Sequence, residues 1–112
     1  MIAPDVEIPI TFDYYERVVK QLIADLKVGD MVIVSSIEPN TMRWFYAPFN
    51  QRTHLEVDHD QNRPAILITN IEVEIIDEEY VFGAIEALYD RAIFRLPFLD
   101  LGMTWTLSKA SR

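Results

Sequence analysis

The sequence predicts a single α+β domain made of two tandem βαβββ modules, of which the second lacks its last strand. A period-two strand followed by an amphipathic helix occurs twice, and strand-like runs follow each helix. The pattern Met-x-Trp recurs in the corresponding strand of both copies, at residues 42–44 and 103–105. We therefore expect module one at residues 1–58, a linker at 59–64 and module two at 65–112.

Composition limits the function classes. The 112 residues are 50% apolar and contain no cysteine, so one packed core must hold the fold without disulfides or thiolate chemistry. The net charge of −8 opposes binding to nucleic acid or anionic membranes and favours a cation, although it also serves solubility alone. The sequence has no apolar run of membrane-spanning length and no signal peptide, which predicts a soluble, cytoplasmic protein.

The first strand and helix are predicted from periodicity. Residues 6–10 alternate apolar and polar side chains, as a strand with one covered face does. Asp13 and Glu16 resemble a capping box, and apolar residues recur at helical spacing over residues 15–26. Gly29 then supplies a left-handed stop, so we expect the helix to end there.

Three strands complete the first module. Residues 31–34 form an apolar run, and residues 38–41 read as a turn. Residues 42–47 and 53–58 have strand composition. The polar stretch at 59–64 ends in proline and is predicted to be the linker.

The second module repeats this order. Residues 71–75 alternate as a strand, and a helix is predicted from the spacing of Val81, Ala84, Ile85, Leu88 and Ala92. Strands are expected at 93–96 and 103–107. Because this copy stops one strand short, we expect a partner chain to cover the edge beside residues 103–107, giving a homodimer.

A resemblance to a known superfamily rests on the end of the first module. Residues 42–51 run through a turn containing Pro48 into a strand with Glu56. Asp77, followed by the expected helix at 80–88, adds a second likeness. These features resemble the vicinal oxygen chelate superfamily, which includes glyoxalase I, bleomycin resistance proteins and extradiol dioxygenases. The resemblance implies a curved mixed sheet with a concave ligand cleft and helices on its outer face.

The resemblance also implies where metal ligands would lie, namely on the first and last strands of each module. Glu56 fills one of the four positions, whereas Val6 and Asn70 occupy two others. We therefore expect no complete metal site and no cofactor. Glu56 and His54 remain the candidate ligands for a divalent metal, and Glu56 is the best catalytic candidate.

Candidate ligand-binding residues follow from strand alternation. Glutamates that alternate with apolar residues face away from the predicted helices and would favour a cation, although a solvated surface also explains them and is the simpler interpretation. The aromatic residues could form cleft walls or belong to the core. The candidate set is Glu7, Trp44, Tyr46, His54, Glu56, Glu72, Glu74 and Trp105.

The leading hypothesis is a bleomycin-resistance-like protein that binds a small molecule, with a cation favoured, in an acidic and aromatic cleft. One alternative is a metal-dependent glyoxalase- or dioxygenase-like enzyme, and another is an interaction module without a pocket. The sequence contains no Gly-rich phosphate loop, nucleophile elbow or His-Glu-x-x-His pair. The residues thus do not require catalysis.

Overall fold

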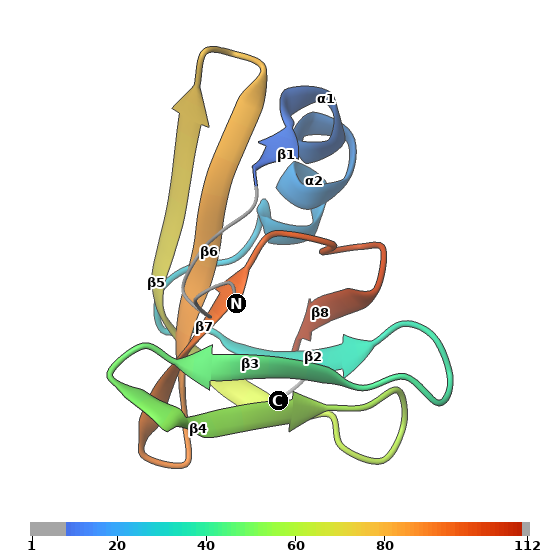
Figure 1. Cartoon of the computed structure of the whole chain (residues 1–112), viewed down its shortest axis with the longest axis vertical. Helices are drawn as coiled ribbons and strands as arrows, with labels where there is room; N and C mark the ends of the chain where they lie inside the picture. The colour runs from blue at the N-terminus through green and yellow to red at the C-terminus, as the bar shows by residue number, and fades with distance from the viewer. Residues whose placement is uncertain (1–8, 111–112) are drawn as a thin grey trace.

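The computed structural model describes residues 9–110, which form one eight-stranded sheet and one short helical segment (Figure 1). The sheet curls into an open half-barrel with the strand order β4-β3-β7-β6-β5-β2-β8, and β1 pairs with β6 off this path. The strands are β1 (Ile10–Thr11), β2 (Met31–Ser36), β3 (Arg43–Ala47), β4 (Asn50–Val57), β5 (Ala65–Ile76), β6 (Tyr80–Tyr89), β7 (Ala92–Pro97) and β8 (Trp105–Lys109).

The strand pairs are antiparallel, so the expected mixed sheet is an antiparallel one. Short hairpin connections explain this, because β3–β4, β5–β6 and β6–β7 each follow one another in the chain. Residues 59–64 connect β4 to β5 without regular structure. The two halves of the chain therefore share one sheet.

The helical segment runs through α1 (Phe12–Tyr14), the π-helical turn η1 (Tyr15–Val19) and α2 (Lys20–Ile23). The Oγ1 atom of Thr11 accepts a hydrogen bond from the Tyr14 N–H at 3.3 Å, so Thr11 is the N-cap. The predicted capping box at Asp13 was wrong, because Asp13 lies inside the first turn. Gly29 has the predicted positive φ, at 99°, although the helix already ends at Ile23.

The core fills the inner side of the curled sheet. Alternation along each strand directs one apolar set inward, and the buried helix residues pack against it. Members from the helix and from separate strands are Val19, Val34, Phe45, Leu55, Ile85, Leu96 and Trp105. The predicted concave cleft with helices outside is therefore wrong, because apolar side chains occupy the concave side.

The predicted second helix was also wrong, because residues 80–89 form strand β6. Val81 and Ile85 are spaced by four, which fits both a strand face and a helix face. Positive φ angles at Asp77 and Glu78, and again at Asp90 and Arg91, end the strand with tight hairpin turns. Tandem βαβββ modules are thus not observed in residues 9–110.

The other strand predictions agree with the structure. Residues 31–34, 42–47, 53–58, 71–75 and 93–96 all coincide with strands, although the strand predicted at 71–75 begins six residues earlier, at Ala65. The last strand begins at Trp105 instead of residue 103. The predicted first strand at residues 6–10 lies almost wholly outside the described residues.

Candidate functional site

A row of polar and charged side chains crosses the outer face of the sheet. Residues paired directly across antiparallel strands share a face, and four consecutive pairs link strands β4, β3, β7, β6 and β5. The row reads His54, Tyr46, Arg95, Glu86 and Asn70. Side chains from residues far apart in the chain thus meet on the side opposite the core.

Arg95 lies in the middle of this face, close to two carboxylates. Its Nη1 atom lies 3.5 Å from Glu72 Oε2 and 3.8 Å from Glu86 Oε2. The Asn70 amide donates to both carboxylates, to Glu72 Oε1 at 3.0 Å and to Glu86 Oε1 at 3.2 Å. Since the Arg95 side chain is only 17% exposed, screening by water is reduced there. One cation and one amide therefore hold two neighbouring carboxylates in place.

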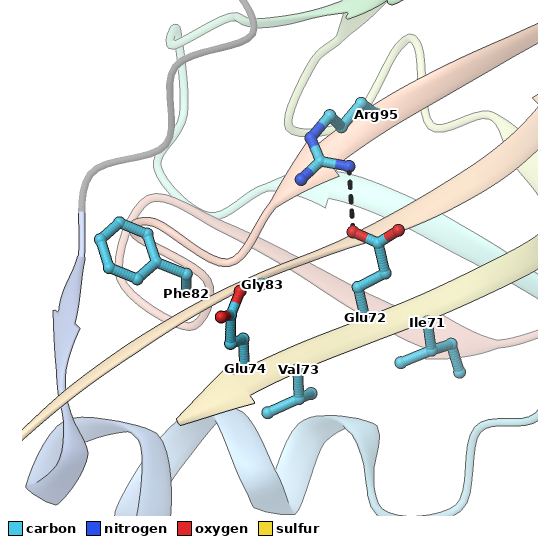
Figure 2. A pocket seen from close by; sticks show the side chains of 7 residues that line it. All are labelled: Ile71, Glu72, Val73, Glu74, Phe82, Gly83 and Arg95. Carbon is cyan, nitrogen blue, oxygen red and sulfur yellow. Dashed lines mark hydrogen bonds and ion pairs between the residues drawn. The ribbon is translucent and has the colours of Figure 1, made fainter. Parts of the chain in front are cut away.

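An open groove of about 380 Å³ lies beside this network. Figure 2 shows Glu72 and Glu74 projecting from β5 to the side where Arg95 and Phe82 lie, while Val73 points away. Glu74 and Phe82 are direct cross-strand partners, so an acidic and an aromatic residue occupy neighbouring positions on this face. The lining residues are Ile71, Glu72, Val73, Glu74, Phe82, Gly83 and Arg95.

The groove contains two kinds of side chain that bind cations in proteins, carboxylates and an aromatic ring. Carboxylates attract a cation, and the face of an aromatic ring adds a cation–π contact. Because Glu72 already contacts Arg95 and Asn70, Glu74 is the carboxylate better placed for a ligand. Among the described residues, Glu74 has no ion-pair or hydrogen-bond partner.

Four predicted site residues lie on the same outer face at its far end. Trp44 pairs with Glu56 and Tyr46 pairs with His54, on the β3–β4 hairpin. The His54 and Trp44 rings meet edge to face at 5.7 Å, and Trp44 is 56% exposed. Strands β7 and β6 separate this hairpin from β5, so the structure does not gather these residues around one ligand with Glu72 and Glu74.

The predicted metal ligands do not form a cluster. His54 and Glu56 share a strand face, as their spacing predicted. Within residues 9–110, however, no group of three or more His, Asp or Glu side chains is placed to hold a metal ion.

Trp105, a candidate for the cleft wall, belongs to the core instead, which is the other position that the sequence left open for it. Its side chain is fully buried, its ring meets Phe45 edge to face at 5.0 Å, and its Nε1 atom donates to the Leu99 carbonyl at 2.9 Å. Glu7, the remaining candidate, lies outside the described residues. Sequence reasoning missed Phe82 and Glu86 because their segment was assigned to a helix. Reading residues 80–89 at period two would have placed both on the face of Glu72 and Glu74.

Comparison with family models, curated proteins and solved structures gives no match. The resemblance to the vicinal oxygen chelate superfamily therefore stays a prediction. In the described residues, no helix is long and apolar enough to cross a membrane. The site must consequently be interpreted from its own geometry.

Proposed function

We propose that this protein binds a small molecule bearing a positive charge in the groove between β5, β6 and β7. The observation that supports the proposal is the cross-strand pair of Glu74 and Phe82, which puts an acidic and an aromatic residue at neighbouring positions in the groove lining. A quaternary ammonium or amidinium group attached to an apolar body matches this pair, because the charge meets Glu74 while the body covers the ring.

The overall charge supports the same ligand class. With 18 acidic and 10 basic residues, the chain attracts cations over most of its surface. Within the groove, Arg95 is already surrounded by Glu72 and Glu86, so its charge opposes an incoming cation less. The proposal requires neither a metal nor a covalent step.

A metal-dependent enzyme is the alternative implied by the resemblance. We do not extend the proposal to it, because His54 and Glu56 lack a third ligand among the described residues. A site with two protein ligands on one exposed strand holds divalent metals poorly.

The proposal is tested with two ligands of nearly equal shape, phenyltrimethylammonium and tert-butylbenzene, titrated against the full chain by NMR. We expect the charged compound to bind more tightly and to shift the amide signals of β5 and β6. Glu74→Gln should weaken that binding about tenfold, which corresponds to the loss of one charge-assisted contact. Glu56→Gln is the matched control, since it removes a carboxylate from the far end of the same face.

Equal binding of the two compounds would refute the proposal, and so would an equal loss of binding in both variants. If only Phe82→Leu weakened binding, the groove would be an apolar site instead of a cation site. That outcome would also contradict the proposed ligand class.

We also propose that the chain pairs as a homodimer through β8. This strand ends the sheet order, and β2 is its one strand neighbour among the described residues. An edge of this kind exposes backbone groups that a second copy can pair. Sedimentation velocity at micromolar concentration should give a dimer, and a monomer throughout that range would contradict the prediction.

A further inference from the structure

We propose that the outer edge of β5, over residues 70–76, accepts an extended segment of a partner protein as an added β-strand. The partner segment alternates basic and apolar residues. This inference goes beyond the ligand of the groove and rests on backbone geometry. It stands or falls independently of small-molecule binding.

The edge begins where the pairing of β5 with β2 ends. The two strands pair through Ala65, Ile66 and Leu67 of β5. Ile68 then exchanges hydrogen bonds with the loop before β2, donating to Asp30 O at 2.9 Å and accepting from Gly29 N at 2.8 Å. Beyond this point, no described strand pairs with the outer edge of β5, although its inner edge pairs with β6 as far as Ile76. Figure 1 shows this part of β5 at the margin of the sheet.

The orientation of the free backbone groups follows from the neighbouring strand. Val73 faces Gly83 across the β5–β6 pair, and the Gly83 carbonyl accepts from Phe98 N at 3.0 Å, on the side away from β5. In an antiparallel pair, facing residues both point toward each other or both point away. The N–H and C=O groups of Val73 therefore point to the open edge.

The same alternation extends along the strand. Glu79 lies four residues before Gly83, so its backbone groups point to the same side of the strand. Its carbonyl oxygen accepts a hydrogen bond from the Phe12 N–H at 2.8 Å, on the side where β1 lies. With a period of two, Ile71 and Ile75 also direct their N–H and C=O groups outward. Three donor–acceptor pairs thus repeat at intervals of about 7 Å, which is the spacing a paired strand requires.

The side chains along this edge select the partner's chemistry. Val73 and Ile75 are 38% and 52% exposed, and they lie on one face of β5. Glu72 and Glu74 lie on the other face. An added strand would match this edge if its apolar residues lay on the face of Val73 and Ile75 and its Lys or Arg residues lay on the face of Glu72 and Glu74.

A second copy of this chain fits the edge less well. A two-fold antiparallel pairing centred on Val73 would place Glu72 opposite the Glu74 of the second copy, twice in each interface. Like charges directly opposite each other destabilise a strand pair. The charge pattern therefore favours a basic partner over self-association at neutral pH.

The first arm of the test uses synthetic nine-residue peptides of alternating Val and Lys with the full-length chain, measured by calorimetry. We expect binding that weakens about tenfold when Glu replaces Lys. Two further peptides carry N-methyl groups on alternate amides, in opposite phases. Because only one phase of amides faces β5, one of these peptides should lose about tenfold in affinity and the other should bind nearly as well.

The second arm changes the protein. Val73→Pro removes an outward N–H without removing a hydrogen bond to β6, so the sheet should still form while the peptide binds about tenfold more weakly. Val73→Thr keeps the N–H and the branched side chain, and should bind as the unmodified chain does. If Val73→Pro does not fold, the two N-methylated peptides still decide the question.

Equal affinity for the two N-methylated peptides would overturn strand addition. A concentration-dependent dimer that disappears in Val73→Pro would overturn the basic partner in favour of a second copy. The two proposals can fail separately. If only the groove proposal is wrong, phenyltrimethylammonium will not bind, but the two N-methylated peptides will still differ in affinity.

Discussion

The ring of Phe98 packs directly on Gly83, so that a Cβ added at Gly83 would lie 2.7 Å from the Cδ2 and Cε2 atoms of that ring. The same Cβ would also collide with the Glu72 carbonyl oxygen. This contact brings β5, β6 and the segment after β7 together beneath the groove.

Gly83→Ala is therefore expected to lower the free energy of unfolding by about 1–3 kcal/mol, because the backbone of β5 must move to admit a methyl group. Urea denaturation measures this. Gly29→Ala is the control, since nothing lies within 4 Å of a Cβ there and the cost comes only from its positive φ of 99°. A smaller loss at Gly83 than at Gly29 would contradict the close packing.

Trp105 should stabilise the fold without contacting ligand. Trp105→Phe leaves the Leu99 carbonyl without its donor and should cost about 1–3 kcal/mol, while Trp105→Ala should cost about 3–5 kcal/mol through the cavity it leaves. Trp44→Phe, at an exposed position, should change stability by less than about 0.5 kcal/mol.

Fluorescence gives an independent reading of the two tryptophans. Acrylamide should quench the emission of Trp44 strongly and that of Trp105 weakly, because Trp105 has 0% exposure. Equal quenching of the two single-tryptophan variants would show that Trp105 is not in the core.

The Arg95 network yields a prediction about coupling. Arg95→Gln leaves Glu72 and Glu86 facing each other without their shared cation, and should cost about 1–3 kcal/mol of unfolding free energy. Adding Glu86→Gln should recover part of that loss, since it removes one of the two repelling charges. A double-mutant cycle measured by urea denaturation checks this. Strictly additive losses would mean that Arg95 and Glu86 do not interact.

Much of the fold could be predicted where the spacing of apolar residues fits either a strand or a helix but not both. The apolar run at residues 31–34 and the alternation at 71–75 lead directly to strands, and the helical spacing places Tyr15, Val19 and Ile23 on the buried face. The segment at 80–89 was ambiguous because Val81 and Ile85 satisfy both periods. Its hairpin turns use Asp, Glu and Arg at positive φ, where Gly or Asn gives the usual sequence signal.

The site could be predicted only in part, because sheet order is a long-range property. Alternation alone places Glu72 and Glu74 on one face of β5. Nothing local in the sequence indicates that β7 pairs with β3, which is what brings Tyr46 to Arg95. Trp105 became a candidate for the cleft wall for a related reason, since an assumed internal repeat assigned it the environment of Trp44.

The last prediction concerns acid stability. Asp30 accepts a hydrogen bond at Oδ2 from the Lys27 backbone N–H at 2.9 Å, and the Lys109 Nζ atom lies 3.4 Å from the same oxygen. The Lys27 hydrogen bond, aided by Lys109, holds the pKa of Asp30 below its ordinary value of 3.8. A carboxyl group whose pKa is lower in the folded state contributes stability above its unfolded pKa, and this contribution is lost as the pH falls through the folded pKa.

Asp30→Asn should therefore make the fall in stability shallower as the pH drops through and below the ordinary pKa of 3.8, so that variant and unmodified chain converge at the acid end. Asparagine keeps an oxygen acceptor for the Lys27 N–H, so the difference reports the charge. Asp25→Asn, at an exposed site with no hydrogen-bond partner in the described chain, is the matched control for replacing an aspartate by asparagine. Urea denaturation across this pH range provides the comparison. Parallel profiles for Asp30→Asn and the unmodified chain would mean that Asp30 gains nothing from Lys27 and Lys109 on folding.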